Sequence, residues 1–142
     1  MAALFKFEVY TPYRLFFSDS VEAIILTLMD GDIEVCANHS SFTAPVLPCL
    51  LRIKDKKGQW QTAFTAEGIL EVKDHKTVLV SDSTEWPGEI DHERAVKAMQ
   101  KAEETLKNRT FKFEIETAAS SLKRAQFRIK AWELEQAKQG IE

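Results

Sequence analysis

The sequence predicts an N-terminal antiparallel β-sandwich followed by a C-terminal antiparallel two-helix hairpin. Up to residue 88, short stretches rich in β-branched and aromatic residues alternate with turn signals at roughly 8–12-residue intervals, which is typical of a sandwich or barrel. All four prolines, and every glycine except Gly140, fall in this first part. From Asp91 onward the strong helix formers Ala, Glu, Lys, Arg and Gln dominate. We therefore expect a β-sandwich domain over residues 1–86 and a helical hairpin domain over residues 87–142.

The first predicted strand, Leu4 to Tyr10, shows the pattern of a half-buried strand. Apolar and charged side chains alternate along it, so that one face is apolar and the other polar. Turn residues then separate the later strands, and Asp30-Gly31-Asp32 indicates a tight hairpin. The other expected strands are 21–28, 33–36, 51–54, 60–65, 69–72 and 77–80.

Two helices are predicted after the strands. Asp91 is suited to capping the first helix, because its carboxylate can accept hydrogen bonds from unpaired backbone N–H groups. The stretch 107–110, Lys-Asn-Arg-Thr, is the expected break between the helices. The apolar seams are expected at Ala95, Ala98, Met99, Ala102 and Leu106, and at Ile115, Ala118, Leu122, Ala125, Ile129 and Trp132. Because half of the seam is alanine, the hairpin is expected to be marginally stable without a partner, a ligand or the β-domain.

Composition narrows the functional class. The formal net charge of -3 and a pI of about 5.7 disfavour a dedicated nucleic-acid binder. No apolar run approaches the ~20 residues that span a bilayer, and we expect no signal peptide. Two cysteines, Cys36 and Cys49, make no disulfide framework and are typical of a reducing compartment.

We expect neither a metal site nor catalytic residues. Cys36 and His39 form only half of a zinc pattern, and Cys49 has no ligand at metal spacing, so both cysteines are interpreted as strand-core residues. The phosphate-cradling and nucleophile-elbow glycine motifs are absent from the sequence. The chain is therefore predicted to be no enzyme and to need no catalytic cofactor.

Four cations cluster on the second predicted helix, at positions 123, 124, 128 and 130. Arg124 and Arg128 are one turn apart and share a helix face. Two interpretations remain open: a solvated basic face balanced by nearby glutamates, or a phosphate site, because guanidinium groups bind phosphate oxygens in a bidentate manner. In a closed hairpin Arg94 could join them, and Glu85 and Asp91 are the nearest carboxylates in sequence.

Several motifs, taken in order, resemble the epsilon subunits of bacterial F-type ATP synthases over essentially the whole chain. The strongest is Ile90-Asp91-His92-Glu93-Arg94-Ala95, which is similar to the family's I-D-x-x-R-A nucleotide-binding signature. Weaker matches are Thr11-Pro12, 31–35 with Asn38-His39, 67–72 and 78–82. Glu34, Ala37 and Glu67 depart from the family's Gly, Pro and Gly at those positions.

The resemblance implies a regulatory hairpin that binds ATP. The implied ATP-binding residues are Glu85, Ile90, Asp91, Arg94, Ala95, Lys101, Arg124 and Arg128. Lys101 stands where the family has arginine, and it keeps the charge without the planar fork, so weaker binding is expected.

The resemblance also implies a place in a rotary complex. The implied partners are the gamma subunit, the ring of c subunits and, through the hairpin, the alpha and beta subunits. The implied location is the cytoplasmic face of the bacterial inner membrane. The loops expected to face the ring are Asp30, Gly31, Asp32, Asn38 and His39. A competing interpretation is a free-standing β-sandwich binding module whose hairpin mediates oligomerisation.

Overall fold

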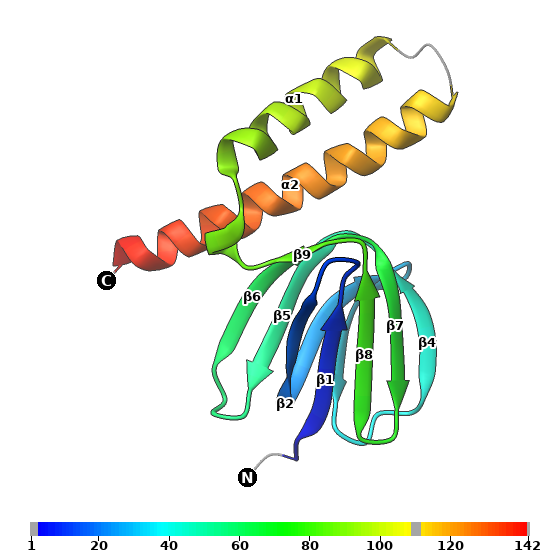
Figure 1. The fold of residues 1–142 in the computed structure, drawn as a ribbon, viewed down its shortest axis with the longest axis vertical. Helices are drawn as coiled ribbons and strands as arrows, with labels where there is room; N and C mark the ends of the chain where they lie inside the picture. The colour runs from blue at the N-terminus through cyan, green and yellow to red at the C-terminus, as the bar shows by residue number, and fades with distance from the viewer. Residues whose placement is uncertain (1–2, 109–111, 142) are drawn as a thin grey trace. The chain divides into compact units, whose positions relative to one another are not determined.

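The computed structural model describes residues 3–108 and 112–141. The chain divides into two compact units, residues 1–85 and 86–142 (Figure 1). Within the described residues, the first unit holds nine strands and the second holds a short 3-10 helix and two α-helices. The predicted order of a β-sandwich followed by a helical hairpin is confirmed.

The strands of the first unit form one mostly antiparallel sheet that folds into two layers. Their bounds are β1 Phe5–Tyr10, β2 Leu15–Leu28, β3 Gly31–Cys36, β4 Phe42–Val46, β5 Cys49–Asp55, β6 Trp60–Thr65, β7 Gly68–Lys73, β8 Lys76–Ser81 and β9 Thr84–Glu85. The long strand β2 connects the layers, because its first half pairs with β1 and its second half with β3 and β5. One layer continues through β8, β7 and β4, and the other through β6 and β9. In the first layer β1 and β8 are parallel.

The core between the layers consists of large apolar side chains. Phe7 and Val9 of β1, Ile24 of β2 and Leu51 of β5 are fully buried. Each stands on the inward-facing side of an alternating strand, so the period of two seen in the sequence fixes which side chains are buried.

Three strands differ most from the sequence prediction, and one of them is the two-residue β9, which was not predicted. β2 begins at Leu15 rather than at position 21, because the polar stretch 18–20 pairs with β1 although it carries no apolar pattern. β4 was not predicted at all. Its Pro45 is normally a strand breaker, but here the strand pairs over its length with β7 and contacts β2 only at Val46.

Gly68, at the start of β7, is required by close backbone approach. A Cβ atom there would lie 2.2 Å from the carbonyl oxygen of Val80 on the paired strand β8. This contact explains why a glycine is needed at position 68.

The second unit contains η1 (Pro87–Glu89), α1 (His92–Asn108) and α2 (Lys112–Ile141). Asp91 caps α1 as predicted: its Oδ1 accepts the N–H of Arg94 at 3.1 Å, and its carbonyl accepts the N–H of Ala95. The predicted break begins at the end of α1, while Arg109 and Thr110 lie outside the described residues. The helices run antiparallel, and α2 is the longer (Figure 1).

Alanines form the buried seam of the hairpin. Ala95 and Ala102 of α1 are buried, as are Ala118, Ala125 and Ala131 of α2. The prediction was wrong for Ala98, which is exposed because it lies off the stripe marked by Ala95 and Ala102. At the start of α1, the ring of His92 stacks on Trp132 of α2 with centroids 3.9 Å apart.

Candidate functional site

The predicted nucleotide motif forms the start of α1. Ile90 and Ala95 are buried, whereas Arg94 projects into solvent. The Asp91 carboxylate accepts a hydrogen bond from the Arg94 backbone N–H and therefore orders the first turn of α1. The motif thus has a structural function as a helix cap, which any ligand role must be compatible with.

The two predicted arginines of α2 lie one turn apart and are half-buried. The Arg124 guanidinium donates to the Ser121 hydroxyl at 3.4 Å, and both arginines make further contacts. Lys101 is exposed on α1. The second unit therefore carries Arg94, Lys101, Arg124 and Arg128 on its two packed helices.

Glu85 belongs to the other unit. It is the last residue of β9 and accepts a hydrogen bond from the Ser83 hydroxyl at 3.2 Å. The structure thus brings the cationic residues and Asp91 into one unit, and Glu85 lies in the other.

The loops predicted to face the ring lie at opposite ends of the sandwich. Asp32 is the second residue of β3, and its carboxylate accepts a hydrogen bond from the Thr27 hydroxyl. The Thr27 carbonyl in turn accepts a hydrogen bond from the N–H of Leu47, just beyond β4. His39 follows β3 and packs on Phe42, the first residue of β4. Roughly 17 Å of strand separates the two loops, since β3 rises about 3.3 Å per residue. A single flat partner surface at one end therefore contacts only one of them.

A row of exposed apolar side chains crosses the outer face of the first layer. Cross-strand pairing places Leu15 beside Tyr10, Tyr10 beside Val80, Val80 beside Ile69, and Ile69 beside Pro45. Leu15 is 50% exposed, Tyr10 38%, Val80 53% and Ile69 49%. We call these five residues the apolar row. It spans five neighbouring strands, about 19 Å at the usual strand spacing.

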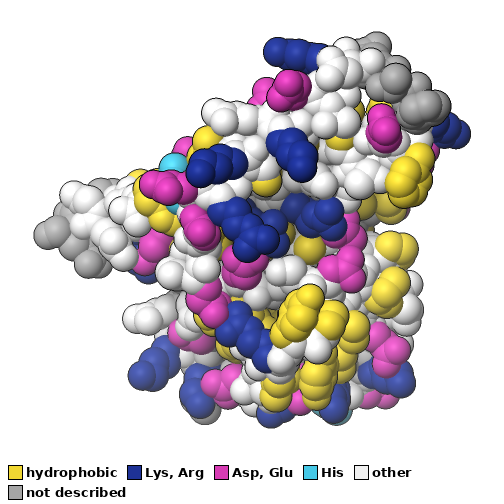
Figure 2. Space-filling view, turned by 45° about the horizontal axis from the view of Figure 1, so that its top comes forward, with side chains coloured by type: hydrophobic (Ala, Val, Ile, Leu, Met, Phe, Trp, Pro, Cys, Tyr) yellow, Lys and Arg dark blue, Asp and Glu magenta, His cyan; other side chains and the backbone are white. Residues whose placement is uncertain are grey.

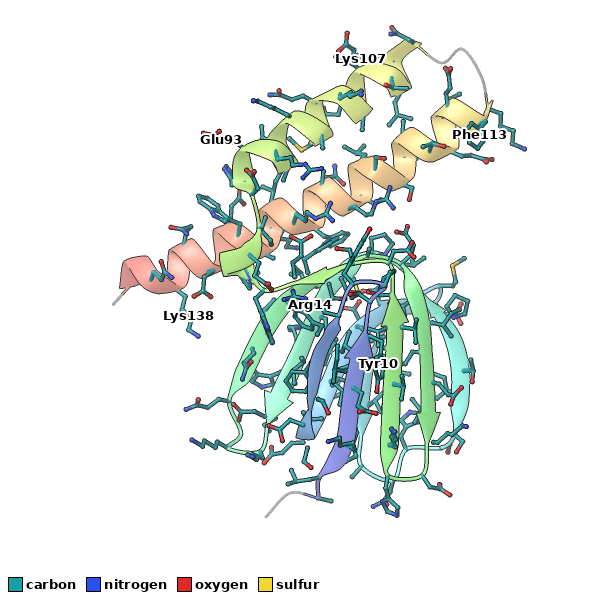
Figure 3. The ribbon with its side chains drawn as sticks, in the orientation of Figure 1. Tyr10, Arg14, Glu93, Lys107, Phe113 and Lys138 are labelled. Carbon is teal, nitrogen blue, oxygen red and sulfur yellow. The ribbon has the colours of Figure 1, made fainter. Side chains whose placement is uncertain are left out.

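Figure 2 shows hydrophobic side chains gathered on the face of the sandwich, and Figure 3 shows Tyr10 on β1 beside β8. Contiguous exposed apolar side chains of this kind mark interaction sites more often than scattered ones. The row could not be predicted from the sequence, because each of its residues is an isolated apolar residue in its own strand. Only the pairing register between the strands brings the five side chains together.

Next to the row, Glu8 is nearly covered although it lies on the outer face of the sheet. Its side chain is 11% exposed and meets donors from three strands. Lys76 Nζ lies 2.9 Å from Glu8 Oε1, and the hydroxyls of Tyr10 and Ser18 donate to Oε2 at 3.2 and 3.4 Å. The hydrogen bond from Lys76 lowers the pKa of the Glu8 carboxyl, and Glu8 raises the pKa of Lys76 in return.

The cysteine prediction holds for one residue of two. Cys49 is buried in β5, and burial raises the pKa of its thiol. Cys36 is exposed at the end of β3, because the neighbouring Val35 takes the inward-facing position. In the described part of the chain, no three His, Cys, Asp or Glu side chains gather in an arrangement that could hold a metal ion.

Comparison with known proteins places the chain in a family. Residues 4–87 match the family model of the β-sandwich domain of the ATP synthase delta/epsilon chain, and residues 89–133 match that of its long α-helix domain. The chain belongs to the ATP synthase delta/epsilon chain family. The resemblance inferred from the motifs is thereby confirmed.

Curated relatives in this family cover almost the whole chain. The ATP synthase epsilon chain of Caldicellulosiruptor bescii is 44% identical over 90% of this chain and 93% of its own. That of Caldanaerobacter subterraneus is 41% identical over 92% of this chain and 94% of its own. The sequences therefore align through both units.

Solved structures share the fold at lower identity. A chain of the Euglena gracilis mitochondrial ATP synthase has a TM-score of 0.77 at 19% identity, over 89% of this chain and 79% of that chain. A chain from the central stalk and c-ring of the Tetrahymena thermophila enzyme has a TM-score of 0.60 at 13% identity, over 92% and 98%. No helix in the described residues has an apolar window long enough to cross a membrane.

Proposed function

We propose that this chain is the epsilon subunit of the central stalk of a bacterial F-type ATP synthase. In this role it is non-catalytic, couples the catalytic hexamer of alpha and beta subunits to the membrane ring, and regulates ATP hydrolysis through its hairpin. It sits peripherally at the cytoplasmic face of the inner membrane, held there by its partners. The apolar row is the observation that supports the proposal. A subunit that rotates with the central stalk must stay bound to it, and the row offers a permanent surface for that binding.

The row is the docking surface for the gamma subunit. It presents side chains from five strands on a rigid sheet, so a partner meets a preformed surface and little ordering entropy is lost. Acidic and basic residues border the row, among them the Glu8–Lys76 and Glu71–Lys73 pairs, which gives an apolar centre with a polar rim.

A charge introduced into the row tests this docking. Val80→Lys places an ammonium group in the row and should weaken binding to a purified assembly of alpha, beta and gamma subunits by about 10-fold or more. Trp60→Lys is the matched control: Trp60 is 42% exposed on β6, outside the row, and this variant should bind as the wild type does. Equal binding by Val80→Lys and the wild type would overturn the docking surface.

The turn at Asp30-Gly31-Asp32 is the end of the sandwich that faces the ring of c subunits. Met29, at its tip, is 72% exposed beside two acids, so the turn offers both apolar and polar contacts. In a Cys36→Ser background, Asp32→Cys should crosslink to a c-subunit loop, and His39→Cys, at the other end of β3, should not. Crosslinking of Asp32→Cys to alpha or beta alone would reverse the orientation.

The hairpin is the ATP-sensing part. Arg94, Arg124 and Arg128 supply guanidinium groups for phosphate oxygens, Asp91 fixes the first turn of α1, and Lys101 adds a cation without a planar fork. Ile90 and Ala95, in the same unit, complete the proposed site. ATP stabilises the closed hairpin, whereas an extended hairpin reaches the alpha and beta subunits and blocks hydrolysis. A hairpin with a small core is suited to such control, because a ligand shifts an equilibrium by its differential affinity.

Titration calorimetry of the full chain with ATP tests the sensing role. Arg128→Ala should weaken ATP binding by about 10-fold or more, since a charge-assisted contact contributes about 1.5–3 kcal/mol. Lys130→Ala, which removes an exposed cation of α2, serves as the control and should change affinity little. No heat of binding at millimolar ATP, with the helices intact, would mean that the motif is only a helix cap.

The competing module interpretation predicts a stable homodimer that does not bind the gamma-containing assembly. Analytical ultracentrifugation with and without that assembly separates the two functions.

A further inference from the structure

We propose that Glu8 is a positioning residue for gamma docking: its carboxylate holds the Tyr10 phenol in the orientation that the partner meets. This inference rests on the docking role proposed for the apolar row. It concerns a residue outside the row, which acts through Tyr10, a member of the row between Leu15 and Val80.

Glu8 is an unusual acid for the outer face of a sheet. Two cations on the same face, Lys6 and Lys73, are exposed, whereas the Glu8 side chain is 11% exposed. Donors from β1, β2 and β8 converge on it, namely the Tyr10 and Ser18 hydroxyls and the Lys76 ammonium. Covering a carboxylate carries a desolvation cost, and these contacts offset it only while the three strands keep their register.

Tyr10 is where this network meets the row. Its backbone pairs with Leu15 on one side and Val80 on the other, so its ring lies within the apolar row. Its hydroxyl donates to Glu8 Oε2 at 3.2 Å. With the hydroxyl fixed, the ring has lost its rotamer freedom before the partner arrives, and fixing a side chain in its bound conformation increases affinity by reducing that entropic cost.

A double-mutant cycle on the full chain tests the inference, with binding to the purified assembly of alpha, beta and gamma subunits as the measurement. Glu8→Ala removes the acceptor and should weaken binding about 3- to 10-fold, the effect of one hydrogen bond. Tyr10→Phe keeps the ring but removes the donor, and should weaken binding by a similar factor. In the Tyr10→Phe background, Glu8→Ala should then weaken binding no further.

Two further variants separate positioning from a general structural role. Glu8→Gln keeps an acceptor for the Tyr10 hydroxyl and should stay within about 2-fold of wild-type affinity. Glu22→Ala breaks another partly covered ion pair, with Lys54 at 3.3 Å, away from the row, and should leave binding unchanged. Urea unfolding of each variant ensures that binding is compared between folded proteins.

Wild-type affinity in Glu8→Ala, or losses from Glu8→Ala and Tyr10→Phe that add up in the double variant, would overturn the inference. If Glu8→Ala does not fold, wild-type affinity in Tyr10→Phe overturns it by itself. If the proposed docking to gamma is itself wrong, the results differ: either the wild-type chain does not bind the assembly, or Val80→Lys binds it as tightly as the wild type does.

Discussion

The two units differ in what fills their cores. The largest fully buried side chains, which include Phe7, Ile24, Leu51 and Leu79, all belong to the sandwich. Among the described side chains of α1 and α2, the buried ones are alanines, and larger apolar side chains such as Leu106 and Leu122 are only half-buried. Burial of apolar area contributes about 25 cal/mol per Å², so each of these large side chains contributes several times as much as a seam alanine.

This difference agrees with the proposed function, in which the sandwich anchors the chain and the hairpin switches. A unit with a large core keeps a docking surface in one shape. A unit with a small core opens and closes at a cost that a ligand or a partner subunit can supply. Truncations and substitutions in each unit test whether the two cores are independent and how unequal they are.

The largest expected effect comes from removing the hairpin altogether. A chain ending at Pro87 should lose its helical circular dichroism yet remain soluble and unfold in one cooperative urea transition, because the large side chains stay in the sandwich. An aggregated or molten fragment would show that the units share one core.

Single core truncations should differ in size between the units. Leu51→Ala, at a fully buried position of β5, should lower the free energy of unfolding by about 2–5 kcal/mol. Leu122→Ala, at a half-buried position of α2, should cost about 1 kcal/mol, because less area is lost and alanine is a good helix former. Urea titrations of the full chain, followed by circular dichroism, give both values. A larger loss in Leu122→Ala would contradict the unequal cores.

The His92–Trp132 stack should contribute a smaller amount to closing the hairpin. His92→Ala removes an aromatic contact worth about 0.5–1.5 kcal/mol, so the helices should melt earlier while the sandwich transition stays in place. The emission of Trp132, measured in a Trp60→Phe, Trp86→Phe background, reports the loss of the stack. Lys97→Ala, at an exposed position of α1, is the control. Unchanged Trp132 emission in His92→Ala would exclude the stack in solution.

The smallest expected effect lies in the turn between β5 and β6. The Asp55 carboxylate accepts the N–H groups of Gln59 and Lys57 at 2.9 Å, and these hydrogen bonds lower the pKa of Asp55. Because its pKa is lower in the folded than in the unfolded chain, its contribution is complete above the ordinary aspartate pKa of about 4 and is lost as the pH falls through the lower folded value. The stability difference between wild type and Asp55→Asn should therefore shrink with acidification. A difference that stays constant with pH would contradict this assignment.

Local pattern predicted most of the fold, and the misses have physical causes. The alternation along β1 and the cap at Asp91 depend on neighbouring residues, and both were confirmed. β4 was missed because its pairing with β7 overrides the local signal of Pro45. Ala98 was misplaced because several small residues on α1 fit a seam about equally well by spacing.

The site was harder to predict than the fold, because it depends on which strands are neighbours. Motif spacing indicated the cationic residues of the hairpin, and the structure carries them on two packed helices. It did not indicate that Asp32 and His39 lie at opposite ends of β3, nor that Tyr10, Val80 and Ile69 stand side by side. The pairing register between strands that are distant in sequence depends on both strands, so it cannot be predicted from the residues of either one alone.

The parallel pairing of β1 with β8 has a consequence for synthesis of the chain. Lys6 lies opposite Lys76, and Tyr10 lies opposite Val80. The layer is therefore complete only after β8 has been synthesised, although β1 is the first strand of the chain. Pairings this distant in sequence slow folding, because a long loop closes before any contact is gained. On the ribosome, the edge of β1 therefore stays open until β8 emerges, and in this interval the nascent sandwich is most exposed to aggregation.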